Sequence, residues 1–184
     1  MKKIVAVIFL LLAVTSCGYR WGEGGTLTSV HTISVPFVDG DWDGQLTSAI
    51  IRQLGVRSRY QYRSEGGSAI LKVAIIDAWD DNIGFRYDRT KKGKFKSRII
   101  PDETRFGELV EVVLIEACSG TALLGPVRIS AEVDFDHDYY SSRNAINVFS
   151  LGQLTDYDEA HDAAERPLNE RLAKKIVDYL NANW

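Results

Sequence analysis

The chain has 184 residues, of which 45% are hydrophobic and 26% are charged, and its formal net charge is −3. This length suits one domain with a buried core, and the slight acidic excess argues against a protein that binds nucleic acid through its overall charge. The two cysteines, Cys17 and Cys118, are too few for a disulfide framework.

The N-terminus has the order of parts found in a bacterial lipoprotein signal. Lys2 and Lys3 form a positively charged start, residues 4–14 are apolar, and two small residues precede Cys17. The apolar run is shorter than the roughly 20 residues that a membrane-spanning helix needs. In signals of this kind the chain is cut before the cysteine, whose sulfur then carries diacylglycerol, so we expect lipidation at Cys17. An ordinary secretory signal with a chance cysteine is the alternative.

The residue after the cysteine indicates which membrane holds the protein. Aspartate at that position usually retains lipoproteins in the inner membrane, whereas this chain has Gly18. Gly18 therefore favours the outer membrane.

The chain should divide into three parts. We expect a signal peptide over residues 1–16, a lipidated N-terminus and flexible tether over residues 17–28, and a single domain over residues 29–184. No transmembrane segment is expected outside the signal.

The first half of the domain shows the periods of strands and of one helix. The predicted elements are a strand over residues 31–37, a helix over 46–54, an exposed strand over 57–63 and a buried strand over 70–79. His31 falls on the apolar face of the first strand, where a core or interface position is expected. Gly55 should end the helix, and Asp77, Asp80 and Asp81 look like the end of the buried strand.

The second half adds strands and a long helix. The predicted elements are strands over residues 109–117 and 127–135, and a helix that begins at residue 155 or 156 and runs to residue 181. Pro167 should kink that helix or divide it in two. Cys118 is expected to be a buried or semi-buried thiol, and residues 136–154 have no clear assignment. Two helices with one apolar stripe each, and a sheet with one apolar face, favour a two-layer α/β sandwich.

The opening Cys17-Gly18-Tyr19-Arg20 and the order of elements behind it resemble the lipopolysaccharide-assembly lipoproteins of the LptE type, which typically start with Cys-Gly and then Tyr or Phe. The resemblance implies a mixed sheet, here of four to five strands, with two α-helices packed on one face. It also implies a plug inside a large outer-membrane β-barrel partner, with which the protein delivers lipopolysaccharide to the outer leaflet. The expected location is the periplasmic side of the outer membrane, with acyl chains as the anchor.

Residues 83–99 are the segment in which we expect a ligand site. Apolar and basic residues alternate there on either side of a turn, so an extended hairpin would carry an aromatic and aliphatic face opposite a basic one. Lipopolysaccharide phosphates would bind the basic residues, and its acyl chains or core sugars the aromatic ones. The residues concerned are Arg86, Lys94, Lys96 and Arg98, with Phe85 and Tyr87. The alternative is a strand extension whose lysines only keep an edge soluble.

No motif in the sequence indicates catalysis. The alternating carboxylates of Asp134, Asp136 and Asp138 fail as a calcium loop, which would need Gly in place of Tyr139 and Glu in place of Ala145, so a polar strand end is expected. Phosphate loops, nucleophile elbows and His-Glu zinc motifs are absent from the sequence. We therefore expect no enzyme activity, cofactor or metal. The rival function is a periplasm-facing adaptor lipoprotein that activates a cell-wall synthase or pilots another secretion channel.

Overall fold

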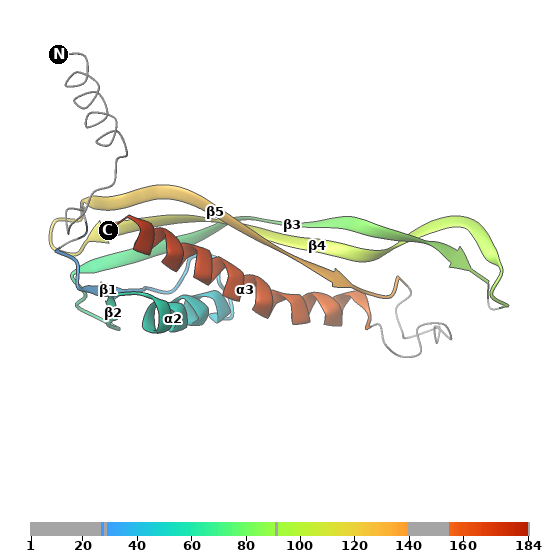
Figure 1. The fold of residues 1–184 in the computed structure, drawn as a ribbon, viewed down its shortest axis with the longest axis horizontal. Coiled ribbons are helices and arrows are strands. Elements are labelled where there is room, and N and C mark those ends of the chain that lie inside the picture. Colours follow the sequence, from blue (N-terminus) through green and yellow to red (C-terminus); the bar gives the residue numbers. More distant parts are fainter. Residues whose placement is uncertain (1–26, 28, 91, 140–154, 184) are drawn as a thin grey trace, which may run out of the picture.

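The computed structural model describes Leu27 and residues 29–90, 92–139 and 155–183. The expected signal peptide, Cys17 and nearly all of the tether lie outside the described residues, as do residues 140–154 of the segment left unassigned. The described chain forms two layers, in which one five-stranded sheet carries two helices on one face (Figure 1). The expected two-layer α/β sandwich is confirmed.

The sheet is mixed and has the strand order β2-β1-β3-β4-β5. The strands are β1 Thr32–Ser34, β2 Gln61–Tyr62, β3 Ala69–Arg89, β4 Phe95–Glu116 and β5 Ala122–Asp136. β1 runs parallel to β2 and to β3, whereas β3, β4 and β5 follow one another as antiparallel neighbours. Three consecutive antiparallel strands thus form most of the sheet, and the two short parallel strands extend it at one side.

β3 and β4 are far longer than the sequence pattern indicated, with 21 and 22 residues. Asp77, Asp80 and Asp81 lie inside β3, so the expectation that they end the strand is wrong. All three are exposed, and their carboxylates stay in water while the backbone ladder with β4 continues. Shifts of register, for example between Ile75 and Asp77, absorb the irregular stretches of this long pairing.

Helix α2, Gln45–Arg57, begins at a buried carboxylate. Asp41 accepts hydrogen bonds from the backbone N–H of Leu46 at 3.3 Å and of Thr47 at 2.7 Å. These bonds satisfy N–H groups that have no partner within the first turn of a helix.

The same helix runs past the residue that was expected to end it. Gly55 lies within α2, which stops only when Ser58 turns to an extended conformation. The backbone N–H and the hydroxyl of Ser58 both donate to the carbonyl of Leu54, at 3.2 and 2.8 Å. The prediction of a stop at Gly55 is wrong because this serine supplies the terminating contacts.

Helix α3, Tyr157–Ala182, is one continuous element. Asp156 caps it by accepting from the backbone N–H of Glu159 at 3.0 Å. Pro167 does not divide the helix. It lies on an exposed side, as does Ala163, whose carbonyl loses its helical partner to the proline ring and can bond water instead.

The core lies between the sheet and the two helices. From α3 it receives a fully buried stripe of Leu168, Leu172, Ile176 and Leu180. His31 and Cys118 do not belong to it, because both are exposed. β1 starts only after His31, and Cys118 follows the end of β4, so neither residue lies on a packed strand face. Neither described helix has a stretch long and apolar enough to cross a membrane.

Candidate functional site

β3 and β4 continue beyond the helices as a long hairpin (Figure 1). The last pair between β4 and β5 is Glu103 with Asp136, and the contact of β3 with the chain before α2 ends at the bridge between Asp39 and Ala74. Beyond Glu103, β3 and β4 therefore form a two-stranded hairpin end, consisting of residues 84–90 and 92–102 in the described chain. The predicted ligand residues all lie in this hairpin end.

One face of the hairpin end is apolar. The register pairs Phe85 with Pro101, Tyr87 with Ile99 and Arg89 with Phe95, and paired residues share a face. Their exposed fractions are high: 59% for Phe85, 60% for Tyr87, 66% for Phe95 and 58% for Ile99. The guanidinium of Arg89 lies 4.5 Å from the centre of the Phe95 ring, which adds a cation to this face.

The opposite face is not purely basic. Lys96 Nζ lies 2.8 Å from Oδ2 of Asp88, and Arg86 Nη2 lies 3.1 Å from Oδ1 of Asp138. Arg86 also approaches Asp102, with Nε 3.7 Å from Oδ2. Two of the four cations expected to bind phosphate are therefore held by carboxylates of the same chain.

Lys94 and Arg98 differ from that pair. Both are exposed, and neither forms an ion pair with any residue in the described part of the chain. The sequence pattern did not single out Arg89 and Lys92, which also lie exposed near the turn. Within the hairpin end, the cations accessible to an anionic ligand are thus Arg89, Lys92, Lys94 and Arg98.

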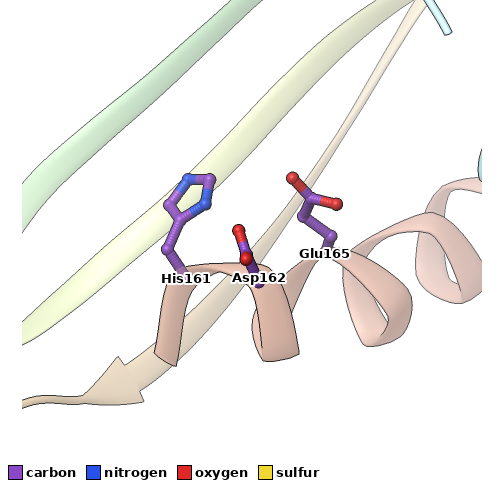
Figure 2. A group of neighbouring side chains, drawn as sticks. All are labelled: His161, Asp162 and Glu165. Carbon is purple, nitrogen blue, oxygen red and sulfur yellow. The ribbon is translucent and has the colours of Figure 1, made fainter. Parts of the chain in front are cut away.

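A second cluster of polar side chains lies at the start of α3. His161, Asp162 and Glu165 extend from the first turns of the helix (Figure 2), and their nearest donor atoms all lie within 4.8 Å of one another. His161 and Glu165 share a helix face because they are four residues apart. The i, i+4 spacing of His161 and Glu165 is visible in the sequence. Nothing in the sequence indicated that Glu108, a residue of strand β4, would lie near them.

Glu108 of β4 faces this cluster from the sheet. It pairs with Ala131, which is buried, so its side chain lies on the helix-covered face. Its Oε2 is buried and has no hydrogen-bond partner among the described residues. Burial, and then the charge of Glu165, raise the pKa of Glu108 to about 7. Burial also raises the pKa of Glu165, with Asp43 adding to the effect.

Aromatic rings fix the position of His161. Its ring centre lies 4.3 Å from that of Phe106 and 5.9 Å from that of Tyr157. Its Nε2 lies 3.7 Å from Oδ1 of Asp80. Burial raises the pKa of Tyr157 to about 12, and the same Asp80 contributes to that shift. The imidazole therefore lies in a partly dry environment with one nitrogen near a carboxylate.

The alternating aspartates at the end of β5 do not gather as a metal site. Asp134 accepts two hydrogen bonds from Arg105, at 2.7 and 2.9 Å, and the pKa of its carboxyl is lowered by that contact. Asp138 is paired with Arg86. These aspartates therefore form a polar strand end, as expected.

Neither protein-family models nor curated protein sequences gave a match to this chain. Among solved structures, the rare lipoprotein B from Shewanella oneidensis is similar at 12% identity and a TM-score of 0.50, with 83% of this chain and 95% of that chain covered. A minor lipoprotein from Acinetobacter baumannii has the same identity and TM-score, with 84% and 95% covered. The chain shares the fold of these bacterial lipoproteins. At this level of identity the similarity extends to the fold alone.

Proposed function

We propose that this protein is an outer-membrane lipoprotein of the LptE type. It would plug the lipopolysaccharide-translocating β-barrel, assist the assembly of that barrel, and bind lipopolysaccharide during its insertion into the outer leaflet. The observation that supports this most is the fold shared with rare lipoprotein B over nearly the whole of that chain. The sequence pattern of residues 1–16 before Cys17, which resembles a lipoprotein signal, adds to it.

The tether limits where the domain can work. Leu27, the first described residue, lies ten positions after Cys17. A fully extended chain of that length spans at most about 35 Å. A domain lipidated at Cys17 would therefore stay close to the periplasmic surface of the outer membrane, or inside a barrel embedded in it.

The hairpin end offers the two kinds of contact that a phosphorylated glycolipid needs. Lys94 and Arg98 are exposed cations without an ion pair in the described chain, and can bind phosphate oxygens. The exposed rings of Phe85 and Tyr87 offer an apolar surface for acyl chains. In this proposal Arg86 and Lys96, which already have carboxylate partners, maintain the shape of the hairpin end.

The test is co-purification. The full chain carrying a C-terminal affinity tag is isolated from detergent-solubilised outer membranes, with Cys17→Ser as the matched variant. We expect a heat-modifiable β-barrel and lipopolysaccharide to co-purify with the native chain, and the variant to lose membrane attachment and lipid labelling. Recovery of only soluble or inner-membrane enzymes would support the adaptor function instead.

A further inference from the structure

We propose that the start of α3 binds one divalent transition-metal ion through His161, Asp162 and Glu165. The three side chains combine one imidazole nitrogen with two carboxylates, a donor set suited to Zn²⁺ or Mn²⁺. This site lies apart from the hairpin end, and the inference does not depend on lipopolysaccharide binding.

The positions of the donors suit a single ion. His161 and Glu165 lie on one helix face, four residues apart, and Asp162 completes a group whose ligand atoms lie within 4.8 Å of one another. Ligands of a tetrahedral zinc ion are roughly 3.3 Å apart, since each lies about 2 Å from the metal. Rotamer adjustments of the exposed Asp162 and half-buried Glu165 suffice to close that difference. Figure 2 shows the three side chains extending toward the same side of α3.

The histidine is already oriented for such a role. Contact with the tilted Phe106 ring, whose centre lies 4.3 Å away, restricts its ring, and its Nε2 lies 3.7 Å from Asp80 Oδ1. Nδ1 is then the nitrogen left for a metal, and Figure 2 shows one ring nitrogen on the side of Asp162 and Glu165. A ligating histidine usually has its other nitrogen hydrogen-bonded to a carboxylate, which fixes its tautomer. Asp80 is placed to provide that contact.

The charge around the site is unbalanced. Glu108 contributes a buried carboxyl oxygen that lacks a hydrogen-bond partner among the described residues. No described Lys or Arg forms an ion pair with Glu108, Asp162 or Glu165. A bound cation would supply the missing positive charge.

Two carboxylates elsewhere in the described structure are paired with cations. Asp88 has Lys96, and Asp134 has Arg105. The cluster at α3 instead has a histidine fixed by aromatic rings, together with several carboxylates. The histidine held among these carboxylates distinguishes the cluster from an ordinary solvated acidic surface and indicates a cation site.

The test uses the full chain in detergent, purified without a histidine tag and stripped with EDTA. Zn²⁺ is titrated by calorimetry, and Co²⁺ is added separately to record its visible absorption spectrum. We expect one ion per chain, and a loss of affinity of about tenfold or more in His161→Gln and in Glu165→Gln. Asp162→Asn, at an exposed position, should also weaken binding without a change in circular dichroism.

Two control variants separate this site from others. Glu159→Gln removes an exposed carboxylate from the same helix, and Cys118→Ser removes the exposed thiol. Both should bind Zn²⁺ as the native chain does. The proposal is overturned if the native chain binds no ion, if binding survives in folded Asp162→Asn and His161→Gln, or if it disappears with Cys118→Ser. Lipopolysaccharide binding should be the same in His161→Gln as in the native chain, so the outcome is independent of the proposed function.

Discussion

Lys96 Nζ lies 2.8 Å from Oδ2 of Asp88, and the Asp88 side chain is only 3% exposed although it belongs to the outer part of a two-stranded hairpin. Oδ1 of the same carboxylate accepts from the backbone N–H of Arg89 at 2.8 Å. Asp88 thus links a side chain of β4 to the backbone of β3. This relationship gives the hairpin end a structural cation, Lys96, beside cations that remain accessible.

Asp88→Asn should loosen the hairpin end without unfolding the domain. The substitution removes the charge that pairs with Lys96, at a cost of about 1–3 kcal/mol that is local to the hairpin end. Hydrogen exchange of amides in residues 84–90 and 95–102 should become about 10- to 100-fold faster. Exchange in the α3 core should stay unchanged. Uniformly faster exchange over the whole domain would contradict a local role.

Lys94→Glu combined with Arg98→Glu should weaken lipopolysaccharide binding by about tenfold, or about 1.4 kcal/mol, because both exposed cations become like charges to phosphate. The measurement is titration of purified lipopolysaccharide, with circular dichroism to verify the fold. Lys72→Glu combined with Lys174→Glu makes the same change in net charge at exposed positions outside the hairpin end. Equal loss in both double variants would show a nonspecific charge effect and count against the site.

Glu108→Gln should stabilise the protein at high pH. The pKa of Glu108 is raised from 4.5 to about 7 by burial and by Glu165. The native state therefore holds this proton more tightly than the unfolded chain, and the free energy of unfolding decreases as pH rises from about 4.5 to about 7. The glutamine cannot ionise, so we expect it to raise the free energy of unfolding by about 1–2 kcal/mol at pH 8. This is less than the full linkage value because the carboxyl is partly solvated.

The measurement is urea denaturation of the native chain and of Glu108→Gln at about pH 5 and at pH 8, both in EDTA. The two proteins should have similar stability at the lower pH and diverge at the higher one. Glu132→Gln, an exposed change on β5, serves as the control and should leave the pH dependence of the native chain unaltered. A gain from Glu108→Gln that is equal at both pH values would rule out the ionisation as its cause.

The free edge of β5 is covered by side chains of α3. Arg171 Nη1 donates to the carbonyl of Glu132 at 2.5 Å, and Lys175 Nζ donates to that of Ser130 at 2.6 Å. Edge carbonyls without such partners can pair with another chain. Arg171→Ala combined with Lys175→Ala should therefore increase self-association, measured by light scattering after size exclusion. Lys174→Ala, a neighbouring exposed change, should leave the protein as it was.

Periodicity predicted the sandwich because its main elements bury a regular stripe. Leu168, Leu172 and Ile176 recur with helical spacing and all reach the core. The alternation of Val127 to Phe135 predicted β5 in the same way. The pattern failed where no residue is fully buried, as over residues 76–83 of β3, where the exposed Asp77 and Asp80 indicated a strand end. There the long antiparallel ladder maintains the strand, and a ladder between distant residues has no local signal.

The candidate site was predicted in part for a similar reason. Alternation placed Phe85 and Tyr87 on one face of the hairpin end, where the structure has them exposed. It could not reveal that Arg86 meets Asp138, because these residues are far apart in the sequence. The cluster of His161 and Glu165 with Glu108 depends likewise on how α3 crosses β4.

Site-specific photo-cross-linking in cells tests the proposed contact of lipopolysaccharide with the hairpin end. A photoreactive amino acid is placed at Tyr87, or at the exposed Lys72 of β3 as the control. We expect a cross-link to lipopolysaccharide from position 87 and none from position 72. No cross-link from position 87, or equal cross-linking from both positions, would contradict a specific contact between lipopolysaccharide and the hairpin end.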